Sequence, residues 1–430
     1  MKKNIKGILK EVLENIKIPK REKEEINNSL NEILNHMKKN ISKLRSNAEI
    51  FVGGSFAKDT MIKTDKCDID VFIRFTKNKK NSGKKPEDIS KLTEKILTGF
   101  DKIRIHGSRD YFRIKINSSF FVEIIPVKKI KSPKEFENIT DLSYSHVNYI
   151  KRKLKPKKIL DEIRLAKAFC YANNCYGAES YIRGFSGYSL ELLIYHYGSF
   201  LKFIKAIEKM DGKTVIDIEK HFKNKEEILM NINSSKLQSP IVLIDPTYKQ
   251  RNALAALSDE TLKKFKKSCK SFLKNPGLDS FKPKKINLEK IKKNAIKKGL
   301  KFILIKIKTN KQKGDIAGGK LLKFYRHLDN EIRGCFKIKS KGFEYNDGKQ
   351  AVVFFVTKKK KEILFQGPKV KDKKNTARFR KKHKKVFTKK ARIYSKEKIN
   401  FNIEEFLKKW TSKNKKKIKE MTITELKIID

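Results

Sequence analysis

One short segment constrains the fold more than any other: CDIDVFIRF at residues 67–75, where two aspartates interrupt an apolar run. Side chains alternate between the faces of a strand, so Asp68 and Asp70 point the same way, about 6.6–6.8 Å apart along the backbone. Ile69 and Val71 then face the core. Two carboxylates this close repel each other unless a cation lies between them, and hard oxygen ligands suit Mg²⁺. The segment therefore predicts a buried strand that carries a divalent-cation site.

A third carboxylate occurs farther along the chain, in FFVEIIPVKKI, where Glu123 is the lone acid of an apolar strand. Burying an unpaired carboxylate costs several kcal/mol or forces it to become neutral, so a metal explains its presence better. Two-metal phosphoryl-transfer sites commonly take a further carboxylate from a neighbouring strand. We therefore expect Asp68, Asp70 and Glu123 to be the catalytic, metal-ligating residues.

A glycine-rich turn, Gly53-Gly54-Ser55, follows the apolar strand EIFV and precedes a short helix. Glycines let the backbone approach a phosphate closely, and Ser55 with amides at a helix N-terminus can bind an anion. Such a turn is by itself typical of many loops. The order strand, turn, helix, carboxylate pair and lone acid is more specific, and it indicates phosphoryl transfer.

Charge is the strongest compositional signal, because 105 Lys and Arg residues face 48 Asp and Glu residues, a net charge of +57. Self-repulsion on this scale favours a polyanionic partner, and nucleic acid is the obvious one. A Lys-biased proteome would raise the charge of any protein and is the plain alternative. The Lys-rich runs near 356–361 and 381–390 are accordingly either solvated faces or contacts to the backbone of an RNA stem.

The remaining composition favours a cytoplasmic protein without a membrane span. No apolar run reaches the ~18 residues that cross a bilayer. The first residues, MKKNIKGILKEVLENI, have helical apolar spacing, which predicts a packed helix and not a signal peptide. The five cysteines are scattered and form neither a disulfide framework nor a CxxC pattern, so we expect Cys170 and Cys175 to fill the core.

The pattern along the chain predicts a multidomain α+β protein. Residues 1–45 read as two amphipathic helices broken near Pro19, followed by short strands, a helix at about 87–100 and a hairpin near 117–119. Residues 140–285 read as helical. LKFILIKIK at 300–308 and the segment QAVVFFV read as strands on either side of a helix at about 320–334, and a Lys-rich tail begins at 369.

The segments GSFAKDT and DIDVF resemble the signature of the DNA polymerase beta-like nucleotidyltransferase superfamily. Three further segments are similar to the class I, archaeal-type CCA-adding enzymes, the tRNA nucleotidyltransferases: NNCYGAESYIRGFSGYSLELLIYHYGSFL at 173–201, IVLIDPTYKQRNALAALS at 241–258 and SFKPKK at 280–285. RGFSGY followed by an apolar helix and YGSF is the most specific part. The resemblance is strong over about 45–290 and thinner over 300–385.

The resemblance implies a polymerase beta-like nucleotidyltransferase head over 1–134 and a helical neck or central domain over 135–285 that recognises the nucleotide base. It also implies an α/β body and basic RNA-binding tail over 286–430 that binds the acceptor and T-stem half of tRNA. The implied reaction is template-independent attack of the tRNA 3′-OH on the α-phosphate of CTP and then ATP, with release of pyrophosphate. The resemblance further suggests a homodimer.

Residue by residue, the resemblance assigns Asp68, Asp70 and Glu123 to Mg²⁺, although the family often has Asp at the third position. It also implies a set of contacts to the incoming nucleotide: Gly54, Ser55, Lys58, His146, Lys167, Tyr176 and Arg251. The chain departs from the family at AGGK, residues 317–320, so nothing is carried over there.

Most of these nucleotide-binding positions also have plainer interpretations. Lys167 lies one helical turn from Arg164, which would let both contact one anion. Tyr176 follows a predicted helix end, where its hydroxyl could meet a ribose or simply lie on the surface beside a glycine turn. His146 could cap a helix or lie on the surface, and Arg251 could only form a salt bridge to Asp245.

Two other functions compete with CCA addition. A poly(A) polymerase shares the same head, but RGFSGY and the compact, Lys-rich C-terminal region favour CCA addition. A catalytically inactive RNA-binding protein could keep the fold, but the intact set of three carboxylates argues against it.

Overall fold

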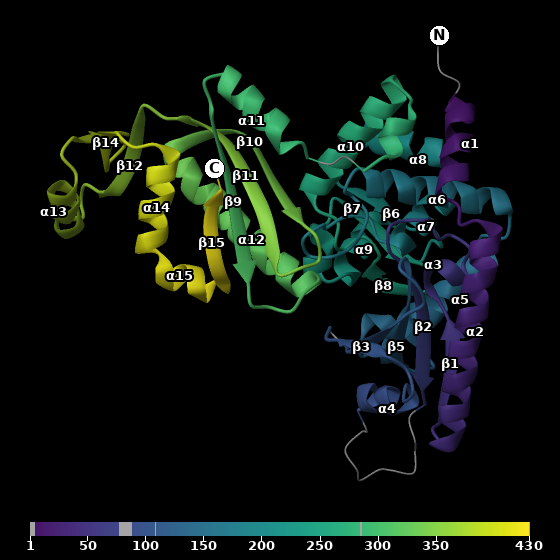
Figure 1. Cartoon of the computed structure of the whole chain (residues 1–430). Coiled ribbons are helices and arrows are strands. Elements are labelled where there is room, and N and C mark those ends of the chain that lie inside the picture. The colour runs from purple at the N-terminus through teal and green to yellow at the C-terminus, as the bar shows by residue number, and fades with distance from the viewer. Residues whose placement is uncertain (1–4, 77–87, 108, 284–285, 430) are drawn as a thin grey trace. The chain divides into compact units, whose positions relative to one another are not determined.

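The computed structural model describes residues 5–76, 88–107, 109–283 and 286–429 (Figure 1). The chain forms two compact units, Met1–Lys284 and Lys285–Asp430. Both mix helices and strands, as a multidomain α+β protein requires. The predicted division near residue 134 falls inside the first unit, so the separation into head and neck stays a prediction. The residues at 284–285, which end the SFKPKK segment, lie outside the described residues.

Two helices begin the first unit, α1 (Ile5–Ile16) and α2 (Lys20–Lys43). Pro19 separates them and occupies the N-cap position of α2, because proline fits the start of a helix but not its interior. The apolar stripe of α2 is buried, and Figure 1 shows this helix running along the first sheet. Both predicted helices are therefore confirmed.

The first sheet has the strand order β1-β2-β5-β4-β3. Its strands are β1 (Ala48–Val52), β2 (Cys67–Phe75), β3 (Lys102–Ile105), β4 (Tyr111–Lys115) and β5 (Phe120–Lys128). All neighbouring pairs are antiparallel except β2 and β5, which run parallel. Parallel neighbours need a crossover connection, which here contains α4 (Ile89–Ile96), β3 and β4. One face of the sheet packs on α2 and α4.

The second half of the first unit is largely helical, with a core of phenylalanines around Phe169 and Phe265. Its helices are α5 (Ser143–Lys153), α6 (Lys157–Ala172), α7 (Gly187–Tyr197), α8 (Phe200–Lys209), α9 (Lys225–Asn231) and α10 (Asp259–Lys274). The all-helical prediction for this region is wrong in one respect. A small sheet also forms here, from β6 (Thr214–Ile216), β7 (Ile241–Asp245) and β8 (Tyr248–Asn252).

The second unit is built on a sheet of order β10-β11-β9-β15. Its strands are β9 (Lys301–Thr309), β10 (Phe336–Tyr345), β11 (Gln350–Lys359) and β15 (Ile423–Ile429). The long helix α12 (Asp315–Cys335) packs against β9, β10 and β11, and α11 (Leu288–Lys297), α14 (Ile403–Lys413) and α15 (Lys415–Glu420) complete this part. The strands predicted from LKFILIKIK and QAVVFFV are confirmed, and α12 begins earlier than the predicted residue 320.

A smaller sheet in the second unit has the order β12-β14-β13, with strands β12 (Glu362–Lys369), β13 (Val386–Lys389) and β14 (Arg392–Lys398). Helix α13 (Lys373–Lys382), whose sequence is KKNTARFRKK, packs on β12 and carries dense positive charge. Over the described ranges, no helix combines the length and apolar character needed to cross a bilayer.

Candidate active site

The pairing of β2 with β5 brings the three predicted carboxylates together. The parallel register places Asp70 opposite Glu123, and Asp68 opposite Phe121. Residues directly opposite each other share a face of a sheet, so all three carboxylates lie on the face away from the core. Ile69 and Val71 on the other face are completely buried. Two separate strands thus build one acidic face.

The three charges on this face disfavour one another. Burial raises the pKa of Asp70 to about 6, and the Asp68 charge adds to the effect while Lys58 opposes it. Burial likewise raises the pKa of Glu123 to about 7, again with Asp68 adding to it and Arg113 opposing it. Carboxylates that repel one another in a partly dry site favour a bound cation, so the donor set suits a hard divalent ion.

Arg113 of β4 supplies a positive charge at this face. Its Nη2 donates to Glu123 Oε1 at 2.5 Å and lies 3.6 Å from Asp68 Oδ1. Among the described residues, no three Asp, Glu, His or Cys side chains are arranged to hold one metal ion. At this face, Glu123 is paired with Arg113. Ligation by all three carboxylates would require Glu123 to exchange the guanidinium for the metal.

The glycine turn lies directly against the acidic face. The Gly53 amide donates to the backbone carbonyl of Asp70 at 2.8 Å. Gly54 has a φ of +60°, and a Cβ there would lie 1.7 Å from Asp70 Oδ2. Only glycine satisfies both constraints, so the turn can touch the carboxylate pair. Ser55 follows in the single turn of α3 (Gly54–Ala57).

Two of the predicted nucleotide-binding lysines meet at one carboxylate. Lys58, just after α3, donates to Glu191 Oε2 at 2.6 Å, and Lys167 of α6 donates to Glu191 Oε1 at 2.9 Å. Lys167 also donates to Thr60 Oγ1 at 2.8 Å. Burial lowers the pKa of Lys167 to about 8, with Lys58 adding to the effect and Glu191 opposing it. The sequence analysis predicted that Lys58 and Lys167 bind the nucleotide, but it did not predict that Glu191 pairs with both of them.

Within the protein, Lys167 and Arg164 contact different carboxylates, and a shared contact to a bound anion stays a prediction. Arg164 forms ion pairs with Asp161 at 2.7 Å and Asp59 at 3.0 Å, while Lys167 pairs with Glu191. Spacing on a helix shows that two cations can converge, but it does not show which acids other elements bring to each of them.

Tyr176 lies near Lys167 and Gly187, and not on an open surface. It is half-buried and forms a β-bridge with Phe185. A Cβ at Gly187 would lie 3.0 Å from the Tyr176 hydroxyl and 3.8 Å from Lys167 Nζ, so this glycine keeps the space between them open. Burial raises the pKa of the Tyr176 hydroxyl, which therefore stays protonated.

His146 and Arg251 converge on one buried acid, Asp245. His146 Nε2 lies 3.0 Å from Asp245 Oδ2, Arg251 pairs with the same oxygen, and the Tyr188 hydroxyl donates to Oδ1 at 3.0 Å. The His146 and Tyr188 rings stack with centroids 4.2 Å apart. Burial lowers the pKa of His146, although Asp245 opposes the shift. The salt bridge between Arg251 and Asp245 is present, while the surface alternative for His146 is wrong.

Sequence reasoning missed Arg113, Glu191 and Tyr188, and it named Asp245 only as a salt-bridge partner of Arg251. The signal for Glu191 was present, since it is the lone acid of the apolar helix GYSLELLIYHY, just as Glu123 is the lone acid of its strand. Asp245 similarly ends the apolar run IVLID. Applying the lone-acid argument to every apolar segment would have found Glu191 and marked Asp245 as more than a salt-bridge partner.

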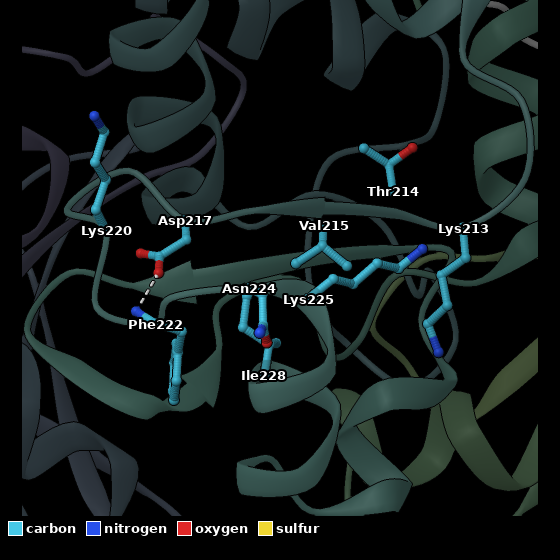
Figure 2. Close-up of a pocket in the computed structure, with 9 residues that line it drawn as sticks. All are labelled: Lys213, Thr214, Val215, Asp217, Lys220, Phe222, Asn224, Lys225 and Ile228. Atoms are coloured by element: carbon cyan, nitrogen blue, oxygen red, sulfur yellow. Dashed lines mark hydrogen bonds between the residues drawn. The ribbon is translucent and has the colours of Figure 1, made fainter.

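A cavity of about 480 Å³ lies elsewhere in the first unit, between β6 and α9 (Figure 2). Three lysines stand around it, and Asp217 accepts a hydrogen bond from the Phe222 amide at 3.0 Å. None of the candidate site residues lines this cavity. The candidate site therefore lies outside this cavity.

Two family models match the first unit. The second domain of tRNA nucleotidyltransferase matches residues 161–282, and the Second Messenger Oligonucleotide or Dinucleotide Synthetase domain matches residues 2–159. Together they cover both halves of the region that holds the site residues. Among solved structures, one of the Cid1 poly(U) polymerase is similar with a TM-score of 0.50 and 13% identity, over 66% of this chain and 100% of that chain. At this identity the likeness shows the fold alone.

Three curated relatives, each named CCA-adding enzyme, are similar in sequence. The protein of Nanoarchaeum equitans is 41% identical over 212 residues, covering 49% of this chain and 51% of that protein. The protein of Archaeoglobus fulgidus is 32% identical, covering 67% of this chain and 60% of that protein. The protein of Methanocaldococcus jannaschii is 30% identical over 410 residues, covering 91% of this chain and 87% of that protein. Because the last match extends over nearly the whole of both chains, this chain belongs to the archaeal-type CCA-adding enzyme family.

Proposed function

We propose that this protein adds CCA to the 3′ end of tRNA without a template, using CTP and then ATP and releasing pyrophosphate. The observation that supports this proposal most directly is that three carboxylates and two lysines lie close together. The acidic face of β2 and β5 lies next to Lys58 and Lys167, whose charges act on Asp70. An acidic face beside two lysines suits a polyphosphate that arrives with a metal ion.

Asp68, Asp70 and Glu123 would hold the divalent ions, and Mg²⁺ is the ion that carboxylate oxygens of this kind suit. Such ions activate an attacking hydroxyl and neutralise charge that develops on the reacting phosphate. Lys58 and Lys167 bind the triphosphate of the incoming nucleotide. Gly54 and Ser55 contact the same triphosphate where the turn meets Asp70.

Arg251, His146 and Tyr176 contact the base and sugar of the nucleotide. Asp245 restrains Arg251 and His146, so their donor groups present a fixed pattern. Pocket volume alone separates similar substrates poorly, whereas hydrogen bonds that only the correct substrate satisfies separate them strongly. The choice between CTP and ATP thus depends on these donors.

The second unit would bind the acceptor and T-stem half of tRNA. Proteins read an A-form stem mostly through its phosphates and 2′-hydroxyls, which suits the basic helix α13. We assign catalysis to residues 1–134, base recognition to 135–285 and tRNA binding to 286–430. The proposal includes a cytoplasmic location, where tRNA is used, and a homodimer, which light scattering of the purified protein would test.

The decisive experiment incubates the purified protein with Mg²⁺, a tRNA that lacks its last three nucleotides, and CTP or ATP, singly and together. We expect CTP alone to add C residues, ATP alone to add nothing, and both together to complete CCA and then stop. Growth beyond three nucleotides with ATP alone would reject CCA addition in favour of a poly(A) polymerase. Binding of tRNA without any incorporation would favour an inactive RNA-binding protein.

A further inference from the structure

Glu191 of α7 joins three elements that are far apart in the sequence. Its Oε2 accepts from Lys58 at 2.6 Å, and its Oε1 accepts from Lys167 at 2.9 Å and from Thr60 Oγ1 at 2.8 Å. The side chain of Glu191 is completely buried, and that of Lys167 is 1% exposed. Both oxygens are therefore used, and each of them contacts a lysine.

A buried carboxylate in this helix needs a reason. Its neighbours Leu190, Leu192 and Leu193 are completely buried, and an apolar residue at the same place would avoid the cost of burying charge. Burial alone would raise the pKa of Glu191, but Lys167 and Lys58 lower it to about 2. Glu191 is thus an anion at every working pH.

The cluster keeps one positive charge in excess, because two ammonium groups share one carboxylate. Those two lysines also act on the acidic face, since both lower the pKa of Asp70. The excess charge therefore acts on Asp70 as well as on Glu191.

We propose that Glu191 is a positioning residue for the nucleotide, which holds Lys58 and Lys167 side by side as cations for the triphosphate of the incoming CTP or ATP. This inference rests on the proposed function and assigns to that site a residue outside its expected set. Glu191 does not touch the nucleotide itself and acts through the two lysines.

The charged groups that face Lys167 decide what happens when Glu191 is lost. They are Glu191 on α7, Lys58 after α3, Arg164 on α6 and Asp70 on β2. Without Glu191, two nearby cations and full burial remain, and both disfavour a charged Lys167. Lys167 would then lose its proton within the neutral range, so triphosphate binding would weaken as the pH rises.

The test measures CTP binding by calorimetry without tRNA, so that no turnover occurs, between pH 6.5 and pH 9. The dissociation constants of Glu191→Gln and of the wild type are compared at each pH, because their ratio cancels the titration of CTP itself. We expect the ratio to rise with pH and to reach on the order of tenfold near pH 8, since one charge-assisted contact is lost. Glu191→Asp keeps the charge, so the ratio of its dissociation constant to that of the wild type should not change with pH.

Asp141→Asn is the matched control. Asp141 is also fully buried and paired with an arginine, Arg109, but it serves backbone amides near residues 128 and 137–138 and not the lysine cluster. The ratio of its CTP dissociation constant to that of the wild type should not change with pH. A ratio for Glu191→Gln that is equally flat would overturn the inference, whereas a wild type that binds no CTP would overturn the proposed function instead.

A triple variant covers the case in which Glu191→Gln fails to fold. Replacing all members of a buried ionic group by apolar residues is often tolerated, so Glu191→Met with Lys58→Met and Lys167→Met should fold. We expect it to bind CTP on the order of tenfold or more weakly than the wild type at every pH. Wild-type affinity in this variant would contradict a role for the cluster in nucleotide binding.

Discussion

At the scale of single residues, the chain uses isolated acids in apolar elements for two purposes. Asp68 and Asp70 meet Glu123 on an acidic face, whereas Glu191 binds two lysines and Asp245 binds an arginine and a histidine. An isolated acid in an apolar segment thus marks both the metal-binding candidates and the acids that position nearby basic side chains.

The carboxylate pair provides the first prediction. Asp68→Ala and Asp70→Ala should each lower kcat for CTP incorporation by at least about 10³-fold, because the metal would lose a ligand. The affinity for tRNA, measured by filter binding, should survive. Asp101→Asn, an exposed acid outside the site, is the control and should keep normal turnover. Near-normal turnover in either alanine variant would show that the metal assignment is wrong.

Asp245 provides the second prediction. Asp245→Asn weakens the hold on Arg251 and leaves His146 without its anionic partner, so the ratio of kcat/KM for CTP and ATP should change about tenfold or more. The variant should also lose about 2 kcal/mol of stability, because the buried side chain no longer accepts charge-assisted hydrogen bonds from Arg251 and Tyr188. Single-nucleotide kinetics and urea unfolding measure the two effects. An unchanged ratio of kcat/KM for CTP and ATP would show that Asp245, Arg251 and His146 do not determine which base is chosen.

The third prediction concerns acid stability. The folded state holds the pKa of Glu191 at about 2, below its ordinary value of 4.5, so its charge stabilises the fold above pH 4.5. This stabilisation is lost as the pH falls from 4.5 toward 2, by about 1.4 kcal/mol per pH unit once the unfolded chain is protonated. Urea unfolding of the wild type and of Glu191→Gln at pH 5, 4 and 3.5 should show the difference between them shrinking with acid. A constant difference would contradict the assigned ion pair.

At the scale of elements, sequence pattern predicted most of what carries the candidate site. Alternation in CDIDVFIRF and the lone acid of FFVEIIPVKKI indicated two strands with their acids on one face, as observed. The small sheet of β6, β7 and β8 was missed because IVLI is a short apolar run, buried throughout, whose periodicity does not separate strand from helix.

Contacts between distant elements were the part that pattern could not supply. Lys58 and Glu191 are 133 residues apart, and His146 and Asp245 are 99 apart. Each lies on a different element, and local spacing carries no information about which elements pack together. Residue types indicated that cations were present, but only the fold shows which acid each of them meets.

The turn between β1 and α3 provides the fourth prediction. Gly54→Ala would place a Cβ 1.7 Å from Asp70 Oδ2 at a backbone φ of +60°, so either the turn or the aspartate must move. We expect a loss of about 10²-fold in kcat/KM, because small displacements of reacting groups are costly, and a loss of about 1–3 kcal/mol of stability. Gly277→Ala is the control, since nothing lies within 4 Å of its added Cβ. Wild-type kinetics in Gly54→Ala would show that the turn does not position Asp70.

At the scale of the whole molecule, the dominant property is a net charge of +57 spread over two compact units. Composition indicated a polyanionic partner, and membership of a tRNA-modifying family agrees with it. Composition did not indicate where contacts occur, because lysines are frequent along nearly all of the chain.

Salt dependence provides the fifth prediction. Lys381→Gln with Lys382→Gln on α13 should reduce the slope of log affinity for tRNA against log salt by about 1–2, because fewer counterions are released on binding. Lys38→Gln with Lys39→Gln on α2 removes the same charge from exposed positions of the first unit and should change the slope less. Titrations between 50 and 200 mM KCl measure both. Equal slopes in the two variants would show that the α13 lysines contribute no more to tRNA binding than the α2 lysines do.

The ion pair between Glu123 and Arg113 has a consequence for the life of the protein before it meets any divalent ion. An acidic surface without compensation would push its strands apart, whereas here a guanidinium from the adjacent strand acts as a built-in counter-charge. A newly made chain can therefore complete this sheet before any divalent ion is bound. Under the proposed function, loading the ion would exchange the partner of Glu123 and leave the strands paired as they are.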